Sequence, residues 1–255
     1  MALALAAACA TPERTTPPFD GALVDLSHEY GPDTIFWPTA EAFRLDVVAA
    51  GATPEGYYYA ANNFATSEHG GTHLDAPVHF AESGWSVEQI PLEQLVGDAV
   101  VVDVSAACAT QPDYQVTVSD LTNWEQQHGS LNGALVLIRT GYSKHWPDAE
   151  RYLGTADRGA DAVAKLHFPG LHPDAARWLV DNRQVKAVGI DTASIDYGQS
   201  TLFETHRALY GHNIPGFENL TNLDRLPARG ATVVALPMKI KARSGAPLRA
   251  IGIVR

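Results

Sequence analysis

Short apolar runs alternate along the chain with amphipathic segments, and this alternation predicts strands separated by helices. Nearly continuous apolar runs are typical of strands buried on both faces. They occur at residues 99–104, 134–139 and 185–190. Residues 118–129 and 172–182 carry the mixed apolar and polar pattern of helices, and each precedes one of these strands. This helix-to-strand order predicts an α/β fold with a mixed β-sheet flanked by helices.

Further strands are expected near both ends of the chain, at residues 22–26, 57–67, 231–240 and 248–254. The longest stretch without a clear pattern runs from residue 141 to residue 170 and is polar and glycine-bearing, which makes it a candidate lid or oligomer contact. With no internal repeat, residues 21–255 are expected to form a single domain.

The first twenty residues differ from the rest of the chain. Residues 1–10 are small and apolar, and a polar, proline-rich stretch follows them. The segment resembles the end of an export signal but lacks the basic start of one. Two interpretations therefore stay open: a signal remnant with a periplasmic protein, or an N-terminal extension of a cytoplasmic one.

Composition restricts the partners. The chain has 255 residues and a formal net charge of -11, which argues against nucleic acid or an anionic membrane as a partner. No run reaches the roughly 18 consecutive apolar residues that would span a bilayer. Cys9 and Cys108 are too few for a disulfide framework or a thiolate zinc site.

A segment rich in metal-binding residue types lies at residues 69–79. His69, His73, Asp75 and His79 are all separated by even numbers of residues, so in extended backbone their side chains point to one side. Two glycines and a proline within the segment disfavour a helix. A single histidine is usually an ordinary polar side chain, but this combination predicts a metal site.

More distant residues are available to complete such a site. His206 and Glu218 flank a short segment and are the strongest distant pair, although each alone also fits a helix residue or a surface charge. Asp191 and Asp196 follow a predicted buried strand, where they either orient His206 or cap a turn.

Several ordered motifs resemble those of the metal-dependent cyclase-like hydrolases, a family that includes bacterial kynurenine formamidase and isatin hydrolase. The resemblance runs from Leu23 to Val254. The motifs are HGGTHLDAPVH at 69–79, FPG at 168–170, GIDTASID at 189–196, His206 followed by Glu218, and LPMKIKARSGAPLR at 236–249. The loop SGAP at 244–247 belongs to the last motif, and we assign it no chemistry from the sequence.

The resemblance implies a role for each residue of the segment. His69, His73 and Asp75 are expected to bind a first metal ion, and Asp75, His206 and Glu218 a second. His79 is expected to act as the acid/base residue. The family also implies a swivelling β/β/α fold, one or two Mn²⁺ or Zn²⁺ ions, and a homodimer or higher homo-oligomer.

The expected reaction is hydrolysis of an amide C–N bond in a small aromatic substrate. A divalent ion lowers the pKa of a bound water from about 15.7 to near 7 and polarises a carbonyl, so hydroxide is available to attack. An open aryl formamide such as N-formylkynurenine and a cyclic amide such as isatin both fit. Five aromatic residues close to the segment in sequence are candidate walls for an arene: Phe36, Trp37, Phe64, Phe80 and Trp85.

Two alternatives come from other classes of protein. His73, Asp75 and His206 also match the two-histidine, one-carboxylate triad of a non-haem Fe(II) oxygenase, which would be expected on an all-β jelly roll. A non-catalytic metal-binding protein is the second alternative. The helix-to-strand pattern favours the hydrolase over a jelly-roll oxygenase. The oxygenase triad would also leave His69 and His79 without roles.

Overall fold

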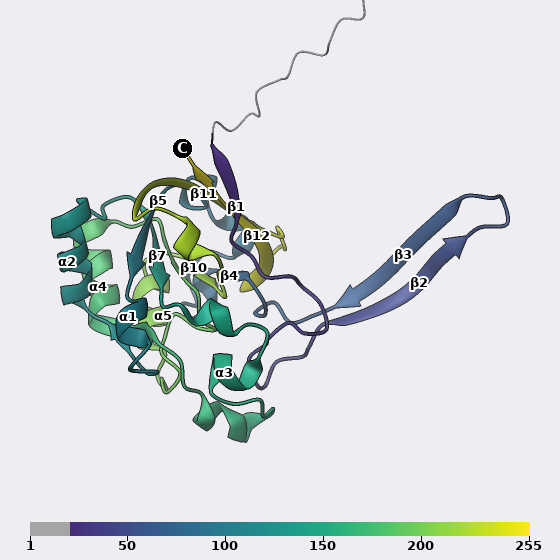
Figure 1. Ribbon diagram of the computed structural model, residues 1–255, viewed down its shortest axis with the longest axis horizontal. Coiled ribbons are helices and arrows are strands. Elements are labelled where there is room, and N and C mark those ends of the chain that lie inside the picture. The colour runs from purple at the N-terminus through teal and green to yellow at the C-terminus, as the bar shows by residue number, and fades with distance from the viewer. Residues whose placement is uncertain (1–20) are drawn as a thin grey trace, which may run out of the picture.

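An eight-stranded mixed sheet forms the centre of the computed structural model, which describes residues 21–255 (Figure 1). The strand order is β1-β12-β11-β5-β7-β9-β10-β4, and β4 also bonds to β12, so the sheet closes on itself. The strands are β1 (Ala22–Asp25), β4 (His73–Asp75), β5 (Val96–Asp103), β7 (Leu135–Arg139), β9 (Ala187–Ile190), β10 (Gly216–Glu218), β11 (Arg229–Pro237) and β12 (Gly245–Val254).

Closure is the main difference from the expected architecture. The α/β class and the mixed sheet are confirmed: β5, β7, β9 and β10 run parallel, while β11, β12, β1 and β4 pair antiparallel. The expectation of a sheet simply flanked by helices is wrong, because the strands form a closed barrel and the helices are few. The three-residue β4 joins the two ends of the sheet, and so short a strand gives no periodic signal in the sequence.

Three of the α-helices have more than one and a half turns, and their ends follow local sequence signals. In α2 the Thr117 side chain accepts from the Asp120 amide, and the helix ends before Gly129, whose φ is 89°. In α4, Pro173 occupies the first turn. The α-helices are α1 (Ser105–Cys108), α2 (Val118–His128), α3 (Ala149–Leu153), α4 (Pro173–Arg183) and α5 (Glu204–Tyr210).

Two hydrophobic cores lie on opposite faces of the sheet. Alternate residues of each strand point to opposite sides. In β7, Leu135 and Leu137 point into the barrel with side chains from the other strands, while Val136 and Ile138 point outward. The outward residues pack with helix residues such as Leu121 of α2. The helices therefore cover the outside of the barrel, and a second, separate core fills its inside.

A two-stranded hairpin projects from this body. β2 (Arg44–Ala52) and β3 (Tyr58–Ala65) pair only with each other and extend away from the barrel (Figure 1). A strand over residues 57–67 was expected from the sequence, but β2 was not, because nearly all of its residues are exposed and it lacks the pattern of a buried strand. We call residues 44–65 the arm.

The stretch without a clear sequence pattern contains short helices and buried aromatic residues. Residues 141–170 contain η4 (Tyr142–His145), α3 and η5 (Ala160–Lys165), and Tyr152 and Phe168 within them are fully buried. A last small sheet pairs β6 (Gln115–Val116) with β8 (Gly170–Leu171). None of the helices described over residues 21–255 has both the length and the hydropathy needed to cross a membrane. The expectations for residues 1–20 lie outside the described residues.

The inner core yields a prediction for stability. Leu137 is fully buried in the barrel, so Leu137→Ala should lower the free energy of unfolding by about 2–5 kcal/mol, through lost burial and an unfilled cavity. Leu92, 64% exposed, is the matched control, and Leu92→Ala should cost less than about 1 kcal/mol. Urea denaturation measures both. Equal losses for the two variants would contradict this assignment of the core.

Candidate metal centre and active site

Strand β4 and its partner β10 place the central residues of the site. His73 and Asp75 lie on one face of β4, and Leu74 between them points into the barrel core. In the ladder with β10, Glu218 is directly opposite His73, so these two side chains are neighbours on the outer face. The site therefore lies on the outside of the barrel, on the side where the helices pack.

Both ladder partners of Asp75 are glycines. Gly216 of β10 and Gly245 of β12 lie opposite it on its two sides. A Cβ on Gly216 would lie 2.5 Å from the Tyr210 hydroxyl oxygen, and a Cβ on Gly245 would lie 2.4 Å from Cε1 of His69. The absence of a side chain at each position makes room for Tyr210 and His69 to reach the Asp75 carboxylate.

The remaining residues arrive from three different elements. His69 precedes the bend at Gly70 and Gly71, where Gly71 has φ of 55°. His79 ends the 3₁₀ turn η1 (Pro77–His79), and His206 lies on α5. The expected extended backbone thus occurs at β4 and the expected bend at the glycines, but His79 reaches the site from a turn rather than from a continuous strand.

Asp75 is the residue around which the others gather. Its side chain is 1% exposed, and Oδ1 lies 2.6 Å from His69 Nδ1 and 3.0 Å from His73 Nε2. Oδ2 accepts a hydrogen bond of 2.9 Å from the Tyr210 hydroxyl and lies 3.3 Å from His206 Nε2. Burial opposes ionisation, but the surrounding imidazoles hold the pKa of Asp75 well below its usual range.

His73 and Glu218 form the second half of this cluster. His73 Nδ1 donates to the Gly71 carbonyl at 2.9 Å, which leaves Nε2 facing Asp75 and Glu218 Oε2, 3.4 Å away. Burial acts against a charged ring, but the two carboxylates outweigh it and raise the pKa of His73 to about 9. Burial, reinforced by the charge of Asp75, raises the pKa of Glu218.

His206 is oriented from behind by a carboxylate. Its Nδ1 lies 2.5 Å from Asp196 Oδ2, and its Nε2 lies 3.3 Å from Glu218 Oε1. Asp196 therefore takes the orienting position that was one of its two expected roles. Asp191 does not: it accepts from the Thr140 amide and hydroxyl and holds the loop after β7.

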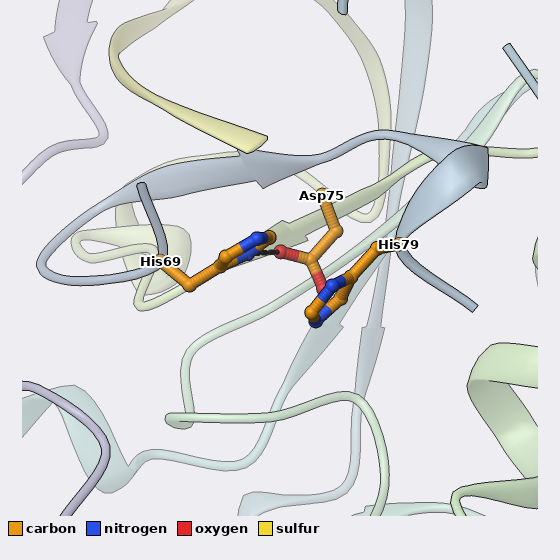
Figure 2. Close-up of side chains that lie close together, drawn as sticks. All are labelled: His69, Asp75 and His79. Carbon is orange, nitrogen blue, oxygen red and sulfur yellow. Dashed lines mark hydrogen bonds and ion pairs between the residues drawn. The ribbon is translucent and has the colours of Figure 1, made fainter. Parts of the chain in front are cut away.

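His79 lies against His69, and their rings stack with centroids 3.9 Å apart. Figure 2 shows the Asp75 carboxylate beside these two rings, with Oδ1 at the edge of the His69 ring. Burial, together with the nearby imidazoles, lowers the pKa of His79 to about 4 despite the charge of Asp75. A neutral ring at this position can accept a proton.

The donor set fits a divalent cation. Among the described residues, two groups bring ligand atoms within 4.8 Å of one another: His69, Asp75 and His79, and His73, Asp75 and Glu218. His73 Nε2 is buried and makes no aligned hydrogen bond, although two carboxylates face it. Imidazoles and carboxylates that converge in this way are the ligands of zinc, manganese and iron.

An apolar cavity of about 350 Å³ opens onto this cluster. Of the five aromatic residues expected to wall it, three line it: Phe36, Trp37 and Phe80. The cavity wall also contains Phe203, which no sequence pattern indicated. Phe203 is distant in sequence from the metal segment, and only the packing of its ring 5.2 Å from that of Phe80 reveals its place.

Two of the expected wall residues lie elsewhere. Phe64 belongs to β3 of the arm and is 55% exposed. Trp85 packs against the inner core. Neither lines the cavity. Closeness in sequence was a poor guide for these two residues, because the chain has left the cavity by the time it reaches them.

Known proteins match this chain along most of its length. The family described as "Putative cyclase" matches residues 24–197. An isatin hydrolase from Roseibium aggregatum is 32% identical over 78% of this chain and 77% of its own. A kynurenine formamidase from Salinibacter ruber is 32% identical over 90% of this chain and 96% of its own.

A solved structure agrees with the sequence relatives. Isatin hydrolase A from Ralstonia solanacearum superposes with a TM-score of 0.82 at 35% identity, covering 92% of each chain. The fold is shared with this solved structure, and the matched range of the family model includes the metal segment. The chain belongs to the Cyclase family.

Proposed function

We propose that this protein is a metal-dependent hydrolase that cleaves an amide C–N bond in a small aromatic substrate. The observation that carries the proposal is the convergence of His69, His73, Asp75, His206 and Glu218 at the floor of an aromatic-walled cavity. The names of the relatives, isatin hydrolase and kynurenine formamidase, support this reaction class.

Asp75 is the residue that two metal positions would share. His69 and His73 approach its Oδ1, whereas His206 approaches its Oδ2 together with Glu218. We therefore assign His69, His73 and Asp75 to a first ion and Asp75, His206 and Glu218 to a second. Imidazole and carboxylate ligands suit Zn²⁺ and Mn²⁺, and one or two ions fit this set.

When bound, a divalent ion supplies a Lewis acid that polarises a carbonyl and makes water acidic enough to ionise near neutral pH. The residues of the chain do the remaining work. His79, which lines the cavity beside the ligands, takes a proton from the attacking water and returns it to the leaving nitrogen. Phe36, Phe80 and Phe203 hold the arene and exclude bulk water from the reacting carbonyl.

The fold also bears on the alternatives. A non-haem iron oxygenase was expected on an all-β jelly roll, and the mixed α/β sheet removes that support. Residues 21–255 act as one catalytic domain in this proposal, with the swivelling β/β/α type as its fold family. The compartment follows from residues 1–20: periplasmic if they are a signal remnant, cytoplasmic otherwise.

A substrate panel tests the reaction directly. Enzyme reconstituted with Zn²⁺ or Mn²⁺ should hydrolyse isatin, followed by its absorbance, or N-formylkynurenine, followed by released formate. Removal of metal by a chelator should reduce turnover to the background rate, and added metal should restore it. Turnover that persists after elemental analysis shows complete loss of metal would contradict the proposed mechanism.

A substitution separates proton transfer from metal binding. His79→Ala should lower kcat by about 10²–10⁴-fold while metal content stays unchanged, because a general acid/base residue contributes on this scale. His212, an exposed histidine, is the matched control, and His212→Ala should leave both unchanged. Loss of metal from His79→Ala would instead place His79 among the ligands.

We further propose that the protein is a homodimer or higher homo-oligomer that associates through the arm. An isolated two-stranded hairpin is only marginally stable in water, so the arm needs a surface to cover it. It exposes many large apolar and aromatic side chains: Leu45, Val47, Val48, Tyr57, Tyr58, Tyr59 and Phe64. An exposed apolar patch of this kind marks a protein contact.

Charges placed on the arm test its role. The double substitution Val47→Glu and Val48→Glu should reduce the molar mass measured by light scattering to that of one chain, since charge at an apolar interface is costly. Leu92→Glu, at an equally exposed site on the body, should leave the mass unchanged. A wild-type protein with the mass of a single chain would refute the oligomer.

A further inference from the structure

His69 faces the metal position with a different ring nitrogen from the other two histidine ligands. His73 and His206 each bond through Nδ1 to an oxygen behind them, the Gly71 carbonyl and Asp196, and present Nε2 to the carboxylates. His69 has the opposite arrangement. Its Nδ1 lies 2.6 Å from Asp75 Oδ1, and its Nε2 lies 2.9 Å from the hydroxyl oxygen of Ser244.

Ser244 is in turn bonded to Glu68, the residue before His69. The Ser244 hydroxyl lies 2.8 Å from Glu68 Oε2, which also receives the amides of Ser244 at 3.1 Å and Gly245 at 3.3 Å. The other oxygen of Glu68 lies 3.5 Å from Nε of Arg243. Every group that faces Glu68 here is a donor or a cation, so its carboxylate acts as an acceptor.

The direction of the hydrogen bonds follows from counting protons. A serine hydroxyl has one proton, and Ser244 donates it to Glu68 because the carboxylate has none to give. The hydroxyl oxygen can then only accept from His69, so Nε2 of His69 carries a proton. Nδ1 of His69, which faces Asp75 Oδ1, is then the ring nitrogen left to bind a cation.

The position of the ring is fixed as well as its proton. A Cβ on Gly245 would lie 2.4 Å from His69 Cε1, so the imidazole packs directly on the backbone of the loop that carries Ser244. That loop leads into β12, whereas Glu68 precedes β4. The chain thus brings together two segments distant in sequence around the side of His69 that faces away from Asp75.

We propose that Glu68 and Ser244 are positioning residues that hold a proton on Nε2 of His69 and so present Nδ1 to the metal. The inference rests on the proposed function for the identity of His69 as a ligand. It gives a role to Ser244 of the SGAP motif, which had none from the sequence, while the remaining three residues of the motif belong to β12. Outer hydrogen bonds of this kind fix the tautomer and orientation of a metal-binding histidine.

The ring nitrogens can be read directly in ¹⁵N-labelled protein loaded with Zn²⁺. Long-range ¹H–¹⁵N correlation spectra should show His69 bound through Nδ1 with a proton on Nε2, and His73 and His206 bound through Nε2 with a proton on Nδ1. A His69 ring bound through Nε2, or one without the Nε2 proton, would overturn the proposal. This readout does not depend on turnover.

Zinc affinity supplies the second measurement, by competition with a chelator. Ser244→Ala should weaken zinc binding by about 10–100-fold, the usual effect of losing such a partner. Ser244→Thr, which keeps the hydroxyl, should restore most of the affinity. Ser86 is a buried serine bonded to Gln89, away from the site, and Ser86→Ala should not change the affinity.

The two positioning residues should also act as one unit. Because Glu68 works through the Ser244 hydroxyl, the double variant Glu68→Gln with Ser244→Ala should bind zinc no more weakly than Ser244→Ala alone. Additive losses, or full affinity in Ser244→Ala protein with a wild-type melting temperature, would refute the inference. Failure of the wild-type enzyme to hydrolyse aryl amides would count against the proposed function only.

Discussion

The structure depends on holding one ionised carboxylate, that of Asp75, away from water. Burial of an unpaired charge costs several kcal/mol or more, so such a group persists only with partners on every side. Three imidazoles and the Tyr210 hydroxyl surround Asp75 within 3.3 Å. Room for them exists because glycine occupies both neighbouring ladder positions.

The strand that closes the barrel also carries two residues of the site. β4 is the strand that joins β10 to β12, and it contains His73 and Asp75. Leu74, between them, fills the inner core. Because side chains alternate along the strand, Leu74 stabilises the barrel core while His73 and Asp75 face the site. A substitution that displaced β4 would therefore open the sheet and also move the ligands apart.

Prediction from the sequence was most successful where the signal was local. The apolar runs at 99–104 and 134–139 are strands, and α2 and α4 begin and end close to their capping residues. The arm strand β2 was missed because its residues are exposed and lack an inward-facing pattern. Phe64 and Trp85 were misplaced because neighbours in sequence diverge within a few residues when the chain turns.

The sequence by itself determined which chemistry is available: a spacing that places His73 and Asp75 on one face of a strand, a bend at the glycines, and an α/β order of elements. Only the tertiary structure decided which side chains meet. The pairing of β10 with β4 sets Glu218 opposite His73, and the approach of β12 brings Ser244 to His69. Such contacts join residues far apart in the chain, and local periodicity carries no information about them.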